Sequence, residues 1–350
     1  MTKLAHYGLN QEIRRSHETA IATFLGSLIS EQDVSGKLAM DLRSREPVYI
    51  IIPVHNRKNI TLKCLETLKQ CGDLDRYYTV VVDDGSTDGT SEAITNFYPE
   101  VTILTGDGNL WWTGAIRKGM EYAYEQGAEY SVWLNDDCLV TNGTLSHLVQ
   151  VCGKNKKAII GCQGYFSLDN QKIAFGGKLR TINGYQFRKF PETETNPCDL
   201  LSGNIVCFSK QVILEIGYPD FSATPHYGGD SLYLIRARNA GFKIFVDTHY
   251  LVLDIGSKSQ LFPNRWLFQE GSPLRILKMV FNHKSFLNWK IWLKLETEDY
   301  QFLGLLTFSY KYFLKILVPI IIISLLRFLP YSFRKQISML KRKLANQIST

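Results

Sequence analysis

The sequence is poor in cysteine, and its cysteines lack the spacing of a metal site. Only seven occur among 350 residues, and no two form a Cys-x-x-Cys pair. This excludes a disulfide scaffold, argues against structural zinc and favours a reducing compartment. Glycine shows no three-residue period and apolar residues show no sustained heptad, so collagen-like and coiled-coil classes are excluded as well.

Two kinds of apolar segment are also missing. Residues 1–20 mix acidic and basic side chains without an apolar run, so we expect no secretory leader there. In the apolar C-terminal part the longest uncharged run, Ile316–Leu326, has 11 residues. Because roughly 20 apolar residues are needed to span a bilayer, this run is too short to cross one.

The composition supports a folded body followed by a basic tail. Hydrophobic residues make up 45% and charged residues 21% of the chain, which is enough for a packed core in one large or two modest domains. The net charge is +7. From residue 311 onward there are eight Lys or Arg and no acid, so the preceding residues are nearly neutral. This distribution points to an anionic membrane surface as the partner and not to nucleic acid.

Between residues 48 and 134, apolar strand patterns alternate with helix patterns. Strands are predicted at 48–54, 77–86, 101–104 and 130–134, and helices at 59–71, 90–97 and 113–126. This alternation predicts an α/β fold with a mostly parallel sheet, whose ligands bind at the carboxyl ends of the strands. We expect three regions: an N-terminal helical extension (1–46, with one or two amphipathic helices in 11–45), an α/β domain (47–265) and a C-terminal helical region (266–350).

The turn after the first predicted strand lacks glycine-rich phosphate motifs. The segment Pro53-Val54-His55-Asn56-Arg57 contains no Gly-x-Gly-x-x-Gly, and the chain has no Gly-x-x-x-x-Gly-Lys-Ser/Thr. Dinucleotide-binding proteins and P-loop NTPases therefore lose their main sequence support.

The second predicted strand ends in the acidic segment DDGSTDG, which begins at Asp83. From Asp84 the spacing superficially resembles a calcium loop, but Thr95 stands where the bidentate Glu is required. Two interpretations stay open. The segment either forms an Asx-turn that caps the next helix or supplies a carboxylate that binds a ribose or a base.

A second acidic pair, Asp136-Asp137, follows the strand at 130–134. Carboxylates after a buried strand are costly unless they are solvated, paired or bound to a cation. Hard oxygen ligands suit Mg²⁺ or Mn²⁺ that also bridges phosphates. A solvated turn is the alternative.

Further polar residues occur in two glycine-containing segments. The segment 106–114 contains Trp111 and Trp112, which either offer aromatic surfaces to a ligand or fill a domain seam. Asp230 opens a predicted helix (231–240) after two glycines, as an N-cap or as a general base. His226 is an alternative base, although a lone His is more often structural.

Together, the PVHNR turn, the DDGSTDGT segment, the acidic pair and Gly-Gly-Asp-Ser before a helix resemble glycosyltransferase family 2 over about residues 48–256. The loop at 106–114 is similar to that of bacterial rhamnosyltransferase-like members. The resemblance implies a GT-A fold, a nucleotide-sugar donor and an inverting transfer.

The resemblance also implies roles for individual residues. Asp230 stands at the position of the catalytic base, and Asp137 would hold the metal, Mg²⁺ or Mn²⁺, with Asp136 and Asp254 as possible further ligands. The donor would contact Pro53, His55, Asp84, Trp112, Asp136 and Gly203. Leu134 departs from the family pattern, because an acid often occupies its position.

We therefore expect a metal-dependent glycosyltransferase of the hexosyl or deoxyhexosyl type that acts on a hydroxyl of a saccharide or lipid-linked acceptor in cell-surface glycan synthesis. The alternative is a catalytically silent module that binds nucleotide or glycan during assembly at the membrane. A nucleotidyltransferase would need a Gly-rich basic loop after the first strand, and only Arg57-Lys58 offers that.

The C-terminal residues predict the location of the protein. An apolar stretch followed by the basic clusters 334–335 and 341–343 favours in-plane association with the inner face of the cell membrane, with the body of the protein in the cytoplasm. The alternative is a pair of helices that buries its apolar residues against the body.

Overall fold

The computed structural model describes residues 45–167, 172–182, 184–256, 267–268, 272 and 274–348. The described residues divide into two compact units, one formed by residues up to 221 together with 229–256, and the other by 222–228 and the residues after 256. The helices predicted in 11–45 and the domain boundary predicted at 265 lie outside the described residues.

The first unit is built on a sheet whose leading half is parallel. The strands β1 (Val48–Val54), β2 (Tyr78–Asp83), β3 (Thr102–Thr105) and β4 (Tyr130–Leu134) lie in the order β4-β1-β2-β3, and each neighbouring pair is parallel. The carboxyl ends of these strands therefore meet at one edge of the sheet. That edge carries the segments that begin at His55, Asp84, Gly106 and Asn135.

The sheet continues beyond β4 through later strands. It extends in the order β4-β12-β6-β13-β10, in which β12 is antiparallel to both neighbours and β13 is parallel to β6. These strands are β6 (Ala158–Tyr165), β10 (Thr195–Pro197), β12 (Ile205–Ser209) and β13 (Lys243–Asp254). Short strands β5 (Cys138–Val140) and β7 (Ile173–Phe175) pair with β13 and β6, and a separate small sheet contains β8 (Gly177–Thr181), β9 (Gly184–Phe187) and β11 (Leu200–Leu201).

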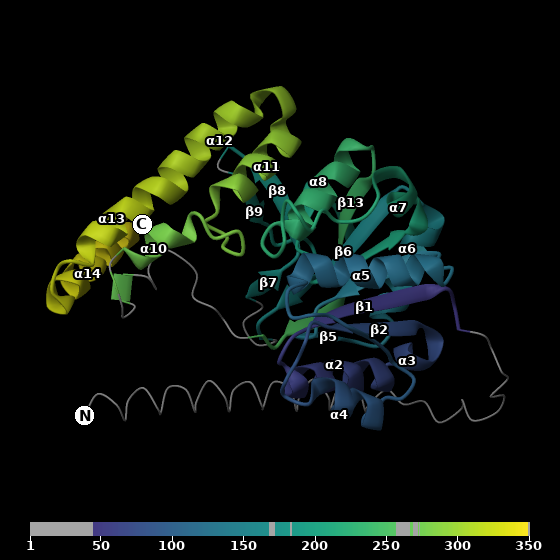
Figure 1. Ribbon diagram of the computed structural model, residues 1–350. Helices are drawn as coiled ribbons and strands as arrows, with labels where there is room; N and C mark the ends of the chain where they lie inside the picture. Colours follow the sequence, from purple (N-terminus) through teal and green to yellow (C-terminus); the bar gives the residue numbers. More distant parts are fainter. Residues whose placement is uncertain are drawn as a thin grey trace. The chain divides into compact units, whose positions relative to one another are not determined.

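Helices cover both faces of the sheet because its strands carry apolar side chains on both faces. On β1, Ile50 and Ile52 join a buried cluster that includes side chains of α2 (Lys58–Gln70), α4 (Thr90–Phe97) and α6 (Thr144–Lys154). Ile51, between them, faces α5 (Trp111–Glu125) on the other side. In Figure 1, α2 and α4 lie on one side of the sheet, and α5 and α8 (Gly229–Asn239) lie on the other. The remaining helices of this unit are α3 (Asp73–Arg76) and α7 (Lys210–Ile216).

The predicted elements of the parallel half are confirmed with small shifts at their ends. The strands at 48–54 and 130–134 and the helix at 90–97 have the predicted bounds. The second strand ends at Asp83 and not at 86, because Asp84 turns away to accept loop hydrogen bonds and Gly85 adopts a φ of 68°. Helix α5 starts at Trp111, two residues earlier than predicted, and the Asp84 carboxylate accepts the N–H of that first residue.

The second unit is helical. Its elements are α10 (Arg275–Met279), α11 (Trp289–Tyr300), η1 (Gln301–Leu303), α12 (Gly304–Tyr312), η2 (Phe313–Leu317), α13 (Val318–Leu326) and α14 (Tyr331–Ile348). The chain reverses at Gln301, where φ is 46°, so that α12 packs against α11. A buried ion pair joins them, with Lys311 Nζ 2.8 Å from a Glu296 carboxylate oxygen. Judged by length and composition alone, the stretch Trp289–Leu326 is long and apolar enough to cross a membrane. This differs from the expectation based on the uncharged run Ile316–Leu326, because the longer stretch remains apolar on average although it contains charged residues such as Lys311 and Lys315.

All seven cysteines lie within the described residues and are free. Five are buried, and Cys71 and Cys198 are partly exposed. The prediction that cysteine does not form a disulfide framework is thereby confirmed for this structure.

One close contact between α5 and β1 can be tested by mutation. A Cβ at Gly119 would lie 2.3 Å from Ile51 Cγ2, whereas a Cβ at the exposed helical residue Gly153 would approach no atom closer than 3.4 Å. We predict that Gly119→Ala lowers the free energy of unfolding by about 1–3 kcal/mol through overpacking. Gly153→Ala, the matched control, should raise it by about 0.5–1 kcal/mol through helix propensity. Urea unfolding measures both, and equal stability of the two variants would contradict the close packing of α5 on the sheet.

Candidate functional site

The Asp84 carboxylate organises the loop that follows β3. Asp84 is buried, and its Oδ1 accepts the backbone N–H groups of Gly108 (2.8 Å) and Leu110 (3.1 Å). Its Oδ2 accepts the N–H of Trp111 at 2.8 Å. Charge-assisted bonds of this kind are about twice as strong as neutral ones, so one carboxylate fixes the path of the Trp-containing loop. A contact between Asp84 and a nucleoside stays a prediction.

The other acids of the DDGSTDG segment are used locally. Asp83 Oδ1 accepts the Ser86 N–H at 2.9 Å, and its other oxygen accepts the Ser91 hydroxyl. Asp88 accepts the N–H groups of Thr90 (3.2 Å) and Lys58 (2.9 Å). The hydrogen bond from the Thr90 hydroxyl is the main cause that lowers the pKa of Asp88, and the bonds from the Lys58 and Thr90 N–H groups add to it. For Asp83 and Asp88 the structure thus corresponds to the turn-and-cap interpretation of the sequence.

The loops after β1 and β2 are hydrogen-bonded to each other. His55 Nδ1 lies 2.6 Å from the Asp84 carbonyl oxygen, and the Asn56 N–H donates to Ser86 Oγ at 2.8 Å. In return, the Thr87 N–H donates to Asn56 Oδ1 at 2.7 Å. Pro53 lies beside Val82 across the β1–β2 pair. The predicted donor-binding residues His55 and Asp84 are therefore direct neighbours.

Arg57 bridges the acidic pair that follows β4. Its Nη1 lies 2.9 Å from Asp136 Oδ1, and its Nη2 donates to Asp137 Oδ2 at 2.8 Å. Thr61 Oγ1 donates to the second oxygen of Asp136 at 3.0 Å. The predicted solvated turn is not found at Asp136, which is only 1% exposed.

The charges of this cluster are strongly coupled. Burial raises the pKa of Asp136 to about 7; Arg57 opposes this effect and the charge of Asp137 adds to it. Burial acts to lower the pKa of Arg57, but the two carboxylates more than offset this and raise it. One guanidinium thus faces two carboxyl groups, so the cluster would attract a further cation.

Asp137 and Asp254 converge on a glycine. The end of β13 pairs with β5, with Asp254 opposite Cys138, and the Ile255 N–H donates to the Asp137 carbonyl oxygen at 2.9 Å. A Cβ at Gly256 would lie 2.5 Å from Asp137 Oδ2 and 2.9 Å from Asp254 Oδ1. Both carboxylates therefore border one small space, and their hard oxygen atoms fit a divalent cation such as Mg²⁺ or Mn²⁺.

Asp230 lies beside Trp112 and Gly203. Its Oδ2 accepts the Gly203 N–H at 2.9 Å, and its Oδ1 accepts the Ser231 N–H at 2.7 Å. A Cβ at Gly203 would lie 2.6 Å from Asp230 Cβ and 2.8 Å from Trp112 Cζ2, so the three residues are in tight contact. Trp112 Nε1 donates to Asn135 Oδ1 at 2.9 Å, which connects Asp230 to the residue that precedes the acidic pair.

The predicted site residues thus lie on one connected edge. Contacts lead from Asp230 through Trp112 to Asn135, and the loop held by Asp84 carries Trp112. His226, the alternative base, belongs to the second compact unit.

Three contributions were missed from the sequence. Arg57, in the turn before α2, and Thr61, in α2, both bind the Asp136 carboxylate. Lys178 on β8 is close enough to Asp230 for the charge of Asp230 to affect the pKa of Lys178. Burial lowers the pKa of Lys178, and Asp230 opposes this effect. Arg57 was visible in the turn after the first strand, but no sequence signal marks Lys178.

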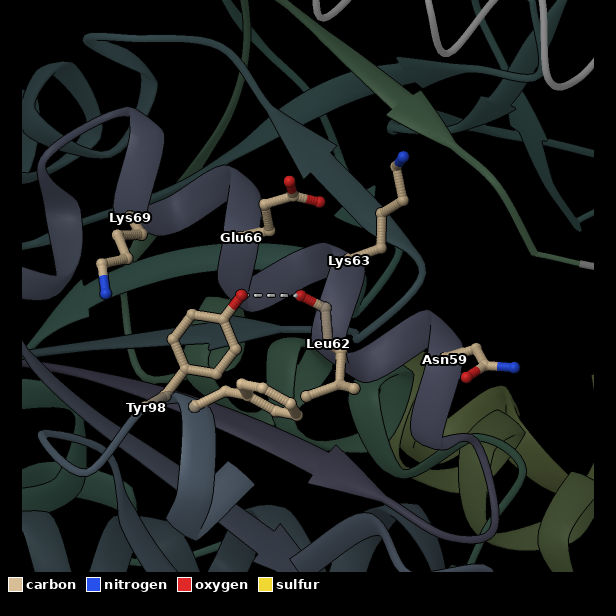
Figure 2. Close-up of a pocket in the computed structure, with 7 residues that line it drawn as sticks. Asn59, Leu62, Lys63, Glu66, Lys69 and Tyr98 are labelled. Atoms are coloured by element: carbon tan, nitrogen blue, oxygen red, sulfur yellow. Dashed lines mark hydrogen bonds between the residues drawn. The ribbon is translucent and has the colours of Figure 1, made fainter. Parts of the chain in front are cut away.

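A separate hollow of about 420 Å³ lies between α2 and the end of α4. Figure 2 shows its lining side chains, including Lys63, Glu66 and Tyr98. The Tyr98 hydroxyl donates to the Leu62 carbonyl oxygen at 3.4 Å. None of the acidic residues discussed above lines it. We therefore do not assign this hollow to the candidate site.

Part of the chain is similar to known glycosyltransferases. The family model described as Glycosyl transferase family 2 matches residues 49–213. A poly(ribitol-phosphate) beta-glucosyltransferase of Bacillus spizizenii is 27% identical over 164 residues, which are 45% of this chain and 23% of the relative. Glycosyltransferase AglE of Haloferax volcanii is 24% identical over 204 residues, 56% of this chain and 63% of the relative. The chain thus spans less than two thirds of the length of either relative.

A solved structure shares the fold. GalNAc-T7 with UDP, GalNAc and Mn²⁺ superposes with a TM-score of 0.51 at 13% identity, covering 78% of this chain and 57% of that one. The likeness concerns the fold, a mostly parallel sheet flanked by helices. It confirms the predicted GT-A class.

The coupling between Arg57 and Asp136 can be measured by a double-mutant cycle. We predict that Arg57→Met lowers the free energy of unfolding by about 1–3 kcal/mol, because it leaves the buried Asp136 carboxylate without its cationic partner. The loss is moderate because solvent already screens the partly exposed guanidinium in the wild type. The double variant Arg57→Met/Asp136→Asn should lose less than the sum of the single variants, with a coupling of about 1–3 kcal/mol. Urea unfolding at pH 8 in EDTA gives all four values. Strict additivity would show that the bridge contributes nothing.

Proposed function

We propose that the protein is an inverting glycosyltransferase that moves a hexosyl or deoxyhexosyl group from a nucleoside-diphosphate sugar to a hydroxyl of a saccharide or lipid-linked acceptor. The observation that carries this proposal is the set of acids at one sheet edge: Asp84 after β2, Asp136 and Asp137 after β4, Asp254 at the end of β13 and Asp230 at the start of α8. The match of residues 49–213 to the family model supports it. The similarity of the loop at 106–114 to rhamnosyltransferase-like members is the support for a deoxyhexosyl donor.

Asp230 is proposed as the base. Backbone N–H groups of Gly203 and Ser231 hold its two oxygens in place, so the carboxylate is oriented before an acceptor arrives. It would take the proton of the acceptor hydroxyl while that oxygen attacks the anomeric carbon from the face opposite the leaving diphosphate. One base suffices for inversion, whereas retaining glycosidases need a second carboxylate as nucleophile. Lys178 on β8 lies close enough to Asp230 for the two charges to interact.

Asp137, with Asp254 and Asp136, would hold the Mg²⁺ or Mn²⁺. The cation supplies charge neutralisation for the leaving diphosphate. In this arrangement Arg57 holds one oxygen of each carboxylate of the acidic pair. Six residues are proposed to contact the donor: Pro53, His55, Asp84, Trp112, Asp136 and Gly203. The Trp112 ring would lie beside the base, Asp230.

A second candidate function is a catalytically silent module that binds nucleotide or glycan during assembly at the membrane. One observation favours it: Leu134, which stands where the family often has an acid, is fully buried in β4 and joins the apolar core. This position therefore supplies no ligand. Turnover of a donor distinguishes the two candidates.

The second unit is proposed to associate with the anionic inner face of the cell membrane, beside the acceptor of a cell-surface glycan pathway. Exposed large apolar side chains are concentrated on the stretch from η1 to α13: Phe302, Leu303, Leu305, Leu306, Tyr310, Phe313, Leu314, Ile321, Ile322 and Leu325. Such a concentration marks an interaction surface, and the basic sequence after it favours an anionic one. The side chains of 341–343 lie outside the part of the chain that the structure describes.

The role of Asp230 is testable with one conservative substitution. We predict that Asp230→Asn lowers the rate of sugar transfer, or of donor hydrolysis, by about 100- to 10,000-fold because the base is lost. Its affinity for a nucleoside diphosphate with Mn²⁺, measured by thermal shift, should change little. Asp75→Asn, at an exposed position of α3, is the control and should keep full activity. Activity retained in Asp230→Asn would remove Asp230 from the mechanism, and a wild-type protein that binds nucleotide without turnover would favour the silent module.

The membrane surface is testable by charge insertion. We predict that Leu305→Asp/Leu306→Asp reduces binding to vesicles containing anionic lipid at least about tenfold, because each buried leucine contributes about 1.5–3 kcal/mol. Phe97→Asp replaces an exposed apolar residue of the first unit and should leave binding unchanged. Vesicle co-flotation measures both. Equal flotation of wild type and the leucine variant would assign the apolar face to protein packing.

A further inference from the structure

Two histidines and a buried aspartate form a cluster outside the residues of the proposed reaction. His147 comes from α6, and Asp247 and His249 come from β13. Their potential ligand atoms all lie within 4.8 Å of one another. We propose that this cluster binds a late first-row transition-metal ion, Zn²⁺ in the first instance, at a site separate from the proposed donor site.

The geometry brings both imidazoles to one carboxylate oxygen. His147 Nε2 lies 3.0 Å and His249 Nδ1 lies 2.7 Å from Asp247 Oδ1. Zinc takes histidine nitrogen and carboxylate oxygen at about 2.0–2.2 Å, so small side-chain movements admit an ion among the three atoms. Two histidines and one carboxylate leave the fourth position of a tetrahedral ion for water.

The electrostatics favour a cation at this point. Asp247 is fully buried, and a buried carboxylate is costly unless it is compensated. Within the described ranges, its only ion-pair partners are these two histidines, which are charged only when protonated. Thr195 Oγ1 donates to Oδ1 at 2.9 Å and the His249 N–H donates to Oδ2 at 3.1 Å. These bonds orient the carboxylate as outer partners do in metal sites.

The backbone makes this arrangement possible. The register between β13 and β6 shifts between Asp247 and Val252, so β13 is irregular where it carries His249. The side chains of His147 and His249 are 21% and 35% exposed, which gives an ion a path from solvent. His249 also lines a cavity of about 200 Å³. Gln163 lines the same cavity, and its buried Oε1 has no hydrogen-bond partner within the described part of the chain.

The donor set distinguishes this cluster from the proposed donor site. Asp136, Asp137 and Asp254 offer oxygen atoms, which suit Mg²⁺ and Mn²⁺, whereas imidazole nitrogen suits Zn²⁺ and similar ions. Asp254 is the last residue of β13, and Asp247 lies before the register shift of the same strand. A metal at Asp247 would join α6, β10 and β13, and this inference does not rest on the proposed transferase activity.

The test uses the full-length protein, stripped with EDTA and titrated with Zn²⁺ by calorimetry, with the melting temperature followed in parallel. We expect the wild type to bind one tight equivalent and to melt at a higher temperature with Zn²⁺. His147→Gln and His249→Gln should each weaken this binding at least about tenfold and abolish the Zn²⁺-dependent shift. Both positions are partly exposed, so these variants are better suited to the test than Asp247→Asn, whose site is fully buried.

Two controls locate the ion. His283→Gln removes an exposed histidine of the second unit, and Asp137→Asn alters the proposed donor site; both should bind Zn²⁺ as the wild type does. The proposal is overturned if the His147 and His249 variants keep wild-type affinity, if the folded wild type binds no Zn²⁺, or if binding is lost in Asp137→Asn instead. Variants that melt lower by the same amount with and without Zn²⁺ would assign the cluster to hydrogen bonding alone.

Discussion

A carboxylate at the end of a buried strand needs a donor or a cation, and this requirement shapes the functional edge of the first unit. Asp84 meets it with three backbone N–H groups and in doing so fixes the loop before α5. Asp136 meets it with Arg57 and Thr61, which ties the turn after β1 to the turn after β4. Removing any of these donors would leave a buried carboxylate with one partner fewer, at a cost in free energy. The loops that are proposed to bind the donor are therefore positioned by the same charges that are proposed to serve the reaction.

Much of the parallel half of the fold is readable from the sequence, because its strands are continuous apolar runs. The run at 48–54 is buried on both faces, as its pattern predicted, and the alternation with helices predicted that the strands are parallel. The later half is less readable. The irregular part of β13 and the small sheet with β8 depend on pairings between distant segments, which local periodicity does not encode. In the helical unit, the reversal at Gln301 also has no turn signature in the sequence, since neither Gly nor Pro stands there.

The candidate site shows the same division. Acids at predicted strand ends were found because the carboxyl ends of parallel strands share an edge, and Asp84, Asp136 and Asp137 all lie there. The groups that bind these acids were not predicted from the sequence. Arg57 reaches Asp136 only because β1 and β4 are neighbours in the sheet. Lys178 near Asp230 and the pair His147–Asp247 are likewise products of tertiary packing. Sequence reasoning identified the charged groups, and the three-dimensional structure was needed to show what compensates them.

The free thiols of the first unit have a practical consequence. Burial raises the pKa of Cys64, Cys138, Cys162 and Cys207 well above the ordinary value, and it raises the pKa of Cys71 and Cys198 to about 12. Because the thiolate is the reactive form, alkylating reagents and peroxide will attack the buried thiols of the folded protein slowly. The rate of their alkylation then follows how often the structure around them opens. The buried native cysteines can thus serve as built-in reporters of local and global unfolding, without any added label, whereas Cys71 and Cys198 are partly exposed.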